Sequence, residues 1–170
     1  NIKIVEDAAH ALPTTCNGQL IGSLDTDISV FSFYANKTMT TGEGGMLVTK
    51  NSEIAEKVKK MRLHGIDRDA FNRFTAKKPS WFYEVVYPGF KYNMTDIAAS
   101  IGIHQLKKIN IFQSRRNEIA AIYNQELQSN KLILPAIPIK GDLHAWHLYI
   151  IRLSKDSEIS RDQFIELMLK

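Results

Sequence analysis

The sequence predicts an α/β fold from three observations. The segment at 27–33 (DISVFSF) alternates as a strand does, and a second short apolar run follows at 46–49 (MLVT). Segments with helical features follow these strands. The pattern changes in the last part of the chain, where Pro135 and Pro138 mark a break. We therefore expect part of a large α/β domain over 1–130 and the beginning of a small α+β domain over 131–170.

Besides 27–33, two strands are expected before the break, at 2–5 and at 46–49. Residues 2–5 are rich in apolar side chains and lead into the sequence EDAAHA, while 46–49 (MLVT) follow a pair of glycines. Gly18 and Gly22 punctuate the chain before the strand at 27–33, which predicts a hairpin or an irregular crossing there.

Four segments are expected to be helices from apolar spacing or capping residues. They are 53–63, 96–107, 110–129 and the segment after Ser160. Asn93 or Thr95 would cap the second of them, and its Gly102 indicates close packing against another element. After the break, 145–153 (AWHLYIIRL) alternates as a strand. Residues 66–92 lack a clear period, which predicts a long functional loop or an insertion.

Composition excludes several classes of protein. The net charge of +4 is spread along the chain, and the doublet Arg115–Arg116 stands alone, so no basic stripe indicates nucleic-acid binding. A single cysteine, Cys16, rules out an internal disulfide framework and suits a reducing cytoplasm. No apolar run has the roughly 20 residues of a membrane span, and no metal site is expected. The first residues already resemble a strand and the final helix has no C-cap, so we expect the chain to be part of a longer one.

The first candidate site is VEDAAHA at 5–11. Carboxylates avoid buried strand ends unless they are paired, yet Asp7 directly follows an apolar run. On a strand Asp7 and Ala9 would face the same side, so a carboxylate and a methyl group could grip the edge and the face of a flat cationic ring. The alternative is that Asp7 caps a helix that the alanines begin. The motif alone leaves both interpretations open.

The second candidate site is FSFYANKTMTTGEGG at 31–45. The hydroxyl of Ser32 and the loop amides could bind a phosphate. The amine of Lys37, if desolvated, could form a Schiff base with an aldehyde. The alternatives are a solvated loop lysine and, for Thr40–Gly45, a tight turn with caps, since the run lacks the ending of a Walker motif.

An acid for a ring nitrogen, a serine for a phosphate and a lysine for an aldehyde are together what pyridoxal phosphate requires. VEDAAHA, then Gly18 and Gly22 followed by Asp25 or Asp27, then FSFYANKTMTTGEGG resemble the DegT-type sugar aminotransferases. The resemblance continues through GFKYNMTDIAASIGIHQLKKI at 89–109 and HAWHLYIIRL at 144–153 and covers nearly the whole chain. It implies a partial fold-type I, pyridoxal-phosphate-dependent transferase.

The resemblance also implies residue roles. Lys37 would be the catalytic lysine that bonds the cofactor and shuttles the proton, and Asp7 would pair with the pyridine nitrogen. Ala9 would pack on the ring face, and Ser32 would bind the cofactor phosphate. His10 would lie near the phenolic oxygen of the ring, although a histidine satisfied by the fold is the alternative. Relatives that dehydrate sugars carry histidine at the position of Lys37, so the lysine argues for amination.

One departure from the family concerns Gly89-Phe90-Lys91-Tyr92-Asn93. Many members have G-x-N-[YF]-R here, and their asparagine reaches the cofactor phosphate of the neighbouring subunit. Lys91 occupies the asparagine position and Asn93 the arginine position. We therefore expect one of them to contact the cofactor across a homodimer interface, while a capping role is the alternative for Asn93.

By resemblance, the expected function is transfer of an amino group from glutamate to a nucleotide-linked 4-keto-sugar, with 2-oxoglutarate as the other product. GFKYNMTD and HAWHLYIIRL most resemble the branch that makes UDP-4-amino-4-deoxy-L-arabinose for lipid A. Family members are more than twice as long, so this chain alone is expected to lack part of the pocket and to be inactive. The alternative function is a non-catalytic homologue or fragment that serves as a dimerisation or interaction module.

Overall fold

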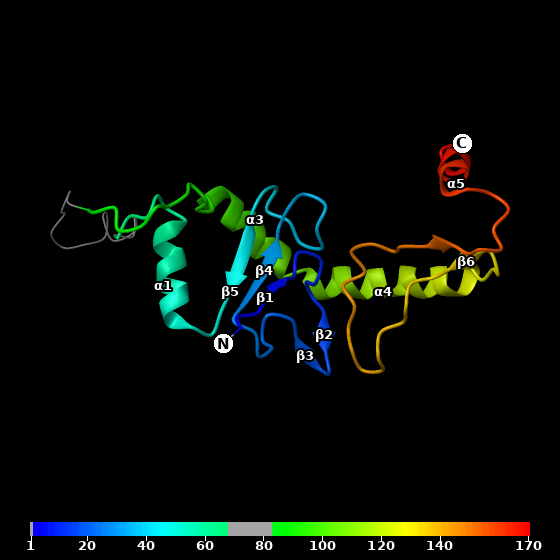
Figure 1. Cartoon of the computed structure of the whole chain (residues 1–170), viewed down its shortest axis with the longest axis horizontal. Helices are drawn as coiled ribbons and strands as arrows, with labels where there is room; N and C mark the ends of the chain where they lie inside the picture. Colours follow the sequence, from blue (N-terminus) through cyan, green and yellow to red (C-terminus); the bar gives the residue numbers. More distant parts are fainter. Residues whose placement is uncertain (1, 68–82) are drawn as a thin grey trace.

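A computed structural model describes residues 2–67 and 83–170, and its centre is a small mixed sheet. The three strands, in sheet order, are β1 (Val5–Asp7), β4 (Ile28–Ser32) and β5 (Gly45–Val48). β1 and β4 are parallel, with Asp7 opposite Val30, whereas β5 runs antiparallel to β4 with Gly45 opposite Ser32. The carboxyl ends of β1 and β4 therefore meet at one edge of the sheet (Figure 1).

Helices surround this sheet and extend away from it. In the described residues they are α1 (Ser52–Met61), α3 (Asp96–Leu106), α4 (Ile109–Glu126) and α5 (Arg161–Met168). α1 and α3 lie beside the sheet, while α4 leads from it toward α5 (Figure 1). The four predicted helices are confirmed in type and order, with α1, α3 and α4 ending earlier than expected. None of the helices in the described part combines the length and apolarity needed to cross a bilayer.

Capping residues explain where the helices begin. The Asn51 side chain accepts hydrogen bonds from the first turn of α1, as expected, and Ser160 forms a capping box with Gln163 at α5. At α3 the cap is Thr95, whose hydroxyl accepts from the amide of Ala98 at 3.2 Å. The alternative capping role for Asn93 is therefore wrong.

Two small antiparallel pairs accompany the main sheet. β2 (Thr15–Cys16) and β3 (Gln19–Leu20) form a hairpin, and β6 (Leu132–Ile133) pairs with β7 (Arg152–Leu153). The hairpin turns through Asn17 and Gly18, whose φ angles of +52° and +76° suit the two central positions of a tight hairpin turn. The expected hairpin before the central strand is thus confirmed.

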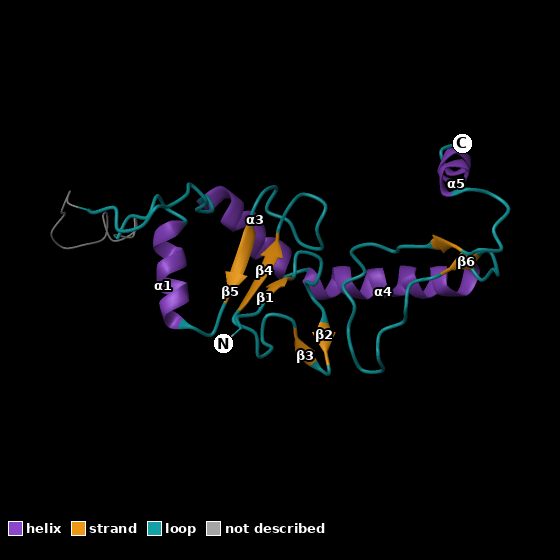
Figure 2. Ribbon diagram, in the orientation of Figure 1, coloured by secondary structure: helices purple, strands orange, loops and turns teal. Residues whose placement is uncertain are grey.

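The expected strand at 145–153 is wrong apart from its last two residues, Arg152 and Leu153. Trp146 adopts a left-handed conformation with φ of +46°, which breaks the extended backbone that alternation requires. Its carbonyl accepts a hydrogen bond from Arg116 on α4 at 2.9 Å, so this segment follows the helix instead of entering a sheet. Most of the chain between α4 and α5 is loop (Figure 2).

Two other expectations need correction or restriction. The first strand covers Val5–Asp7 rather than 2–5, because pairing to β4 begins only at Val5. Of the expected loop or insertion at 66–92, residues 68–82 lie outside the described residues. The part that is described, 83–92, is non-helical and forms isolated bridges with residues just after α1.

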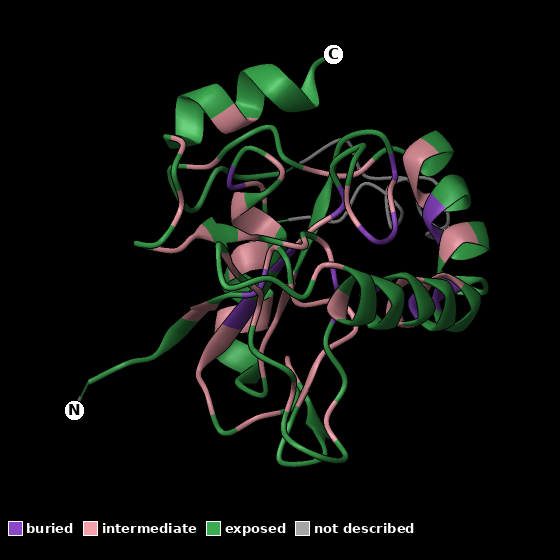
Figure 3. Cartoon of the chain, turned by 90° about the vertical axis from the view of Figure 1, so that its right-hand side faces the viewer, coloured by how far each residue is buried: buried purple, intermediate pink, exposed green. Residues whose placement is uncertain are grey.

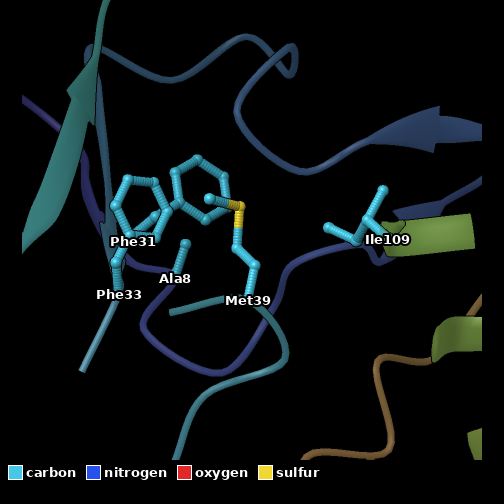
Figure 4. Packing of buried hydrophobic residues seen from close by; sticks show 5 residues of the cluster. All are labelled: Ala8, Phe31, Phe33, Met39 and Ile109. Atoms are coloured by element: carbon cyan, nitrogen blue, oxygen red, sulfur yellow. The ribbon is translucent and has the colours of Figure 1, made fainter. Parts of the chain in front are cut away.

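The hydrophobic core lies directly under the loop that follows β4. Its buried members are Ala8, Phe31, Phe33, Met39 and Ile109. Figure 4 shows Met39 beside Ala8, Phe31 and Phe33, with Ile109 to one side at the start of α4. The end of the chain adds nothing to this core. α5, which ends at the C label of Figure 3, has no buried residue. The loop that contains Lys37 is thus anchored by core residues on both sides.

Gly102 on α3 packs against the same loop. A Cβ atom at this position would lie 2.9 Å from Cγ2 of Thr41, closer than two such atoms can approach. The expected close packing at Gly102 is therefore confirmed, and its partner is the segment that follows Lys37.

Candidate active site

Asp7 and Ser32 lie at the carboxyl ends of two adjacent parallel strands. Asp7 is the last residue of β1 and is exposed, while Ser32 is the last residue of β4 and is half-buried. In the described part of the chain, the Asp7 carboxylate accepts one hydrogen bond, from the amide of Ala9 at 3.1 Å. The other carboxylate oxygen thus remains able to accept a hydrogen bond from a ligand.

The turn after β1 carries Ala9 and His10. The amide of buried Ala8 still donates to Val30 at 2.9 Å, and then the chain turns, with the amide of Ala11 donating to the Ala8 carbonyl at 2.9 Å. The expectation that Asp7 and Ala9 face the same side of a strand is therefore wrong, because the strand ends at Asp7. The alternative in which Asp7 caps a helix is wrong too, since this segment forms a turn. The Asp7–Ala9 hydrogen bond brings the two residues together instead.

Lys37 lies in the loop between β4 and β5. The amide of Phe33 donates to the Gly44 carbonyl at 2.8 Å, and the amide of Thr41 donates to the Phe33 carbonyl at 2.9 Å, which closes the base of the loop. Lys37 itself is half-buried, and its backbone amide donates to Tyr34 at 3.0 Å. Within residues 2–67 and 83–170, its ammonium group has no ion pair or hydrogen bond. The amine of Lys37 is therefore uncommitted as far as the described part of the chain extends.

The Thr40–Gly45 run forms a turn that satisfies its own polar groups. The Thr40 hydroxyl donates to the Phe33 carbonyl and accepts from the amide of Gly42 at 2.8 Å, and buried Thr41 donates to the Glu43 carbonyl at 2.6 Å. These hydroxyls are thus committed within the loop. The structure favours the tight-turn interpretation of this run over a separate phosphate loop.

Ser32 differs from these threonines in its hydrogen bonding. Its Oγ accepts a hydrogen bond from the amide of Tyr34 at 3.3 Å. Because the oxygen acts here as acceptor, the hydroxyl hydrogen remains available to donate to an anionic oxygen. Ser32 is therefore the hydroxyl of the loop base that is best suited to a phosphate.

His147 joins the same edge from far along the chain. Its ring lies against that of His10, with centroids 4.2 Å apart and planes inclined at 50°. Burial lowers the pKa of His147 below its ordinary value, and the positive charges of His10, Lys37 and Arg116 lower this pKa further. The structure thus brings Lys37, His10 and Arg116 close enough to His147 for their charges to act on its ring.

Sequence reasoning gave no role to His147 or Arg116. His147 lies in HAWHLYIIRL, and Arg116 lies in the doublet with Arg115. The alternation of 145–153 suggested a strand, and a strand offers no reason for His147 to meet His10. One signal was present in the sequence. His147 is a basic residue on an otherwise apolar segment, and Arg116 is a basic residue on the helix before that segment.

Lys91 and Asn93 interact with each other. The Lys91 ammonium donates to the Asn93 side-chain carbonyl, and the backbone of Lys91 bridges to Leu63 after α1. Among the described residues, neither side chain forms a hydrogen bond or ion pair with Asp7, Ser32 or Lys37.

The family model described as the DegT/DnrJ/EryC1/StrS aminotransferase family matches residues 1–170. The chain belongs to this family. Two curated relatives agree: the uncharacterized protein MJ1066 of Methanocaldococcus jannaschii is 53% identical over all of this chain, and the spore coat polysaccharide biosynthesis protein SpsC of Bacillus subtilis is 44% identical over 95% of it.

A solved member of the family has the same fold. The putative sugar aminotransferase Spr1654 of Streptococcus pneumoniae, in its PLP form, is 33% identical and superposes with a TM-score of 0.85 over 99% of this chain. Its PMP form gives a TM-score of 0.87 at 34% identity. The α/β fold-type I assignment is therefore confirmed.

This chain is shorter than its relatives. It spans 44% of MJ1066, 41% of SpsC and 41% of the PLP-form chain of Spr1654. The structure is accordingly one part of the fold that the family shares.

Proposed function

We propose that the protein containing this chain is a pyridoxal-phosphate-dependent aminotransferase that acts on a nucleotide-linked 4-keto-sugar. The observation that carries the proposal is the sheet edge, where Asp7 and Ser32 end adjacent parallel strands and Lys37, whose amine is unpaired among the described residues, follows in the next loop. Membership of an aminotransferase family, with a solved relative in PLP and PMP forms, supports it and favours it over an interaction module.

The residues at this edge suit the three reactive parts of pyridoxal phosphate. The free Asp7 oxygen suits the pyridine N–H, the Ser32 hydroxyl suits the phosphate, and Lys37 suits the aldehyde. When bound, the cofactor supplies an electron sink that stabilises negative charge at the carbon losing its proton. The fit rests on uncommitted atoms of all three residues in the described part of the chain.

Each residue then has a defined task. Asp7 keeps the ring nitrogen protonated, and an ionic hydrogen bond of this kind contributes about 1.5–3 kcal/mol. Lys37 would hold the cofactor by its aldehyde carbon, and its amine, when free, would move the proton at the reacting carbon of the substrate. Ala9 would pack on the ring face, and His10 would lie near the phenolic oxygen.

The overall reaction follows a ping-pong scheme. Glutamate would bind first and depart as 2-oxoglutarate, and the keto-sugar would bind second and receive the amino group, with the cofactor as the carrier of that group between the two half-reactions. For the sugar we propose a UDP-4-keto-pentose, as used in lipid A modification, because GFKYNMTD and HAWHLYIIRL resemble the branch that handles it. A cytoplasmic location suits these nucleotide-linked substrates.

The proposed assembly is a homodimer. Lys91 and Asn93 are hydrogen-bonded to each other and, among the described residues, form no hydrogen bond with Asp7, Ser32 or Lys37, which leaves them able to act on a neighbouring subunit's cofactor. A lysine ammonium there would serve the phosphate as a point charge. We also propose that 1–130 belongs to the large cofactor-binding domain and that 131–170 begins the small domain.

The test uses a protein of the relatives' length that contains this chain. Pyridoxal phosphate is added, the absorbance spectrum is recorded, and borohydride reduction followed by peptide mapping locates the label. We expect a visible band that disappears on reduction, with the label on Lys37. Amino transfer is then assayed with glutamate and UDP-4-keto-pentose.

Matched variants sharpen this test. Lys37→Ala should abolish the band and the label, whereas Lys50→Ala, which changes an exposed lysine after β5, should leave both unchanged. A label on other lysines, with Lys37 unmodified, contradicts the aminotransferase proposal. A labelled Lys37 without transfer to the keto-pentose contradicts only the choice of sugar.

A further inference from the structure

Arg116 is a partly buried cation without a carboxylate partner in the described part of the chain. Its neighbour on α4, Arg115, forms an ion pair with Glu118 at 2.8 Å and is largely exposed. Arg116 instead donates one hydrogen bond, from Nη1 to the Trp146 carbonyl at 2.9 Å. A guanidinium has five N–H donors, so most of those on Arg116 are uncommitted.

His147 presents a second uncommitted polar group next to Arg116. Its Nδ1 atom is buried and has no hydrogen-bond partner among the described residues. Buried polar atoms are normally paired, so an orphaned one indicates a missing partner. The charges that act on His147 come from His10, Lys37 and Arg116, all of them basic.

A cavity of about 200 Å³ lies beside these two residues. Arg116 and His147 line it together with the aromatic side chains of Tyr123, Trp146 and Tyr149. The lining is mostly apolar and aromatic, and a charge interaction is stronger where such side chains replace part of the water around it. This place therefore combines unpaired donors, positive charge and space.

We propose that Arg116 and His147 form a subsite for the anionic group of a substrate, either a carboxylate or a phosphate. The inference rests on the proposed function, because it takes Lys37 as the reacting amine and places the subsite within electrostatic range of it. An arginine fork matches the two oxygens of a carboxylate or phosphate. The orphaned ring nitrogen of His147 can donate to the same group when it carries the hydrogen.

Both substrates of the proposed reaction carry such a group. The amino donor has carboxylates, and the sugar carries the diphosphate of its nucleotide. The shared chemistry is an oxyanion next to Arg116, and the two sources are separated by experiment.

The experiment is a calorimetric titration with two probes. The sample is a protein of the relatives' length that contains this chain and is loaded with cofactor. Glutarate represents the donor carboxylates without the amine, and uridine 5′-diphosphate represents the nucleotide. We expect Arg116→Gln to weaken one probe roughly tenfold to a hundredfold, the loss typical of charge-assisted hydrogen bonds. Arg115→Gln, the matched control, should bind both probes as the parent protein does.

The probe that is weakened identifies the source of the anion. Equal binding of both probes by Arg116→Gln and the parent overturns the inference. So does an equal loss in Arg115→Gln, because this would indicate a general effect of charge. If Arg116→Gln does not fold, since it also loses the Trp146 contact, His147→Phe decides: this change keeps a ring against His10 but removes Nδ1. Weaker binding of one probe then supports the subsite, and unchanged binding overturns it.

Failure of this inference is distinguishable from failure of the proposed function. Borohydride labelling of Lys37 tests the cofactor lysine and does not depend on Arg116. The probe titrations repeated without cofactor test Arg116 and do not depend on labelling. A labelled Lys37 with unaffected probe binding leaves the aminotransferase proposal intact and removes the subsite.

Discussion

His147 lies against His10, with their ring centroids 4.2 Å apart. The contact joins the segment that follows α4 to the turn that follows β1, directly beside the Lys37 loop. Residues from opposite ends of the chain therefore meet at the sheet edge. Four expected outcomes follow from this arrangement and from the packing around it.

The first concerns the acid stability of the protein. Burial and neighbouring positive charges lower the pKa of His147 below its ordinary value of 6.5. The unfolded chain then binds more protons than the folded one below that value, so stability falls as the pH drops through about 6.5 and levels off below the lowered pKa. His147→Gln should reduce this fall, measured as the free energy of unfolding in urea at about pH 7.5 and about pH 5.5.

The control for this experiment is His104→Gln, which changes an exposed histidine on α3. It should leave the pH dependence unchanged. Part of the fall will remain in His147→Gln, because burial also lowers the pKa of His144. An identical pH dependence in the parent protein and in His147→Gln contradicts the prediction.

The second concerns Asp142, which ties a late loop to the early hairpin. Its carboxylate accepts hydrogen bonds from the amide of Gly18 at 2.8 Å, the hydroxyl of Thr15 at 2.9 Å and the amide of Asn17 at 2.9 Å. The Gly18 bond is the largest cause of the lowered pKa of Asp142, and those to Thr15 and Asn17 add to it. Asp142→Ala should lower the unfolding temperature, on the order of a few degrees.

The pH dependence of Asp142 has the opposite sign to that of His147. The stabilisation is present above the ordinary carboxyl value of 3.8 and is lost as the pH falls through the lowered pKa. The difference between the parent protein and Asp142→Ala should therefore shrink in strong acid. Scanning calorimetry measures it, with exposed Asp25→Ala as the control; a constant difference at every pH would refute the prediction.

The third concerns Gly102, which packs against the Lys37 loop. Replacing glycine by alanine in an open helix position stabilises by about 1 kcal/mol. At Gly102 the new methyl would lie 2.9 Å from Thr41, so the sign should reverse, with a loss of about 1–3 kcal/mol. Urea unfolding checks the sign, and Ile103→Ala, at an exposed position of α3, is the control. A stabilised Gly102→Ala would show that the loop gives way freely.

The fourth concerns Ser32 and the cofactor phosphate. Removing one hydrogen bond to a charged group costs about 1.5–3 kcal/mol, which corresponds to a loss of affinity of roughly tenfold to a hundredfold. Ser32→Ala should therefore weaken pyridoxal phosphate binding by this factor, measured by equilibrium dialysis of the relative-length protein. Ser52→Ala, on exposed α1, should bind normally. Unchanged affinity in Ser32→Ala would remove the serine from the phosphate site.

The family of the chain and most of its elements could be predicted from the sequence. Asn51 and Ser160 marked helix starts because capping depends on a few neighbouring residues. Asn17–Gly18 formed the tight turn because their backbones accept positive φ angles. These features depend on local chemistry, which the order of residues carries directly.

The two expectations that the structure corrected, the strand at 145–153 and the facing of Asp7 and Ala9, share a different cause. The strand expected at 145–153 was wrong because Trp146 is held in a left-handed conformation next to Arg116, a residue on a distant helix. The facing of Asp7 and Ala9 was argued from strand alternation, but pairing with β4 ends the strand at Asp7. In both cases a partner far along the chain decided the backbone.

The sequence by itself determined the family, the helix caps and the three residue types that suit pyridoxal phosphate, because motifs and caps are short-range properties. Only the tertiary structure decided that His147 meets His10 and that Arg116, beside a cavity, spends one donor on Trp146 and leaves the others uncommitted among the described residues. Such contacts depend on how α4 and the segment after it pack onto the sheet edge. Packing is set by the whole core, so no local pattern of residues contains it.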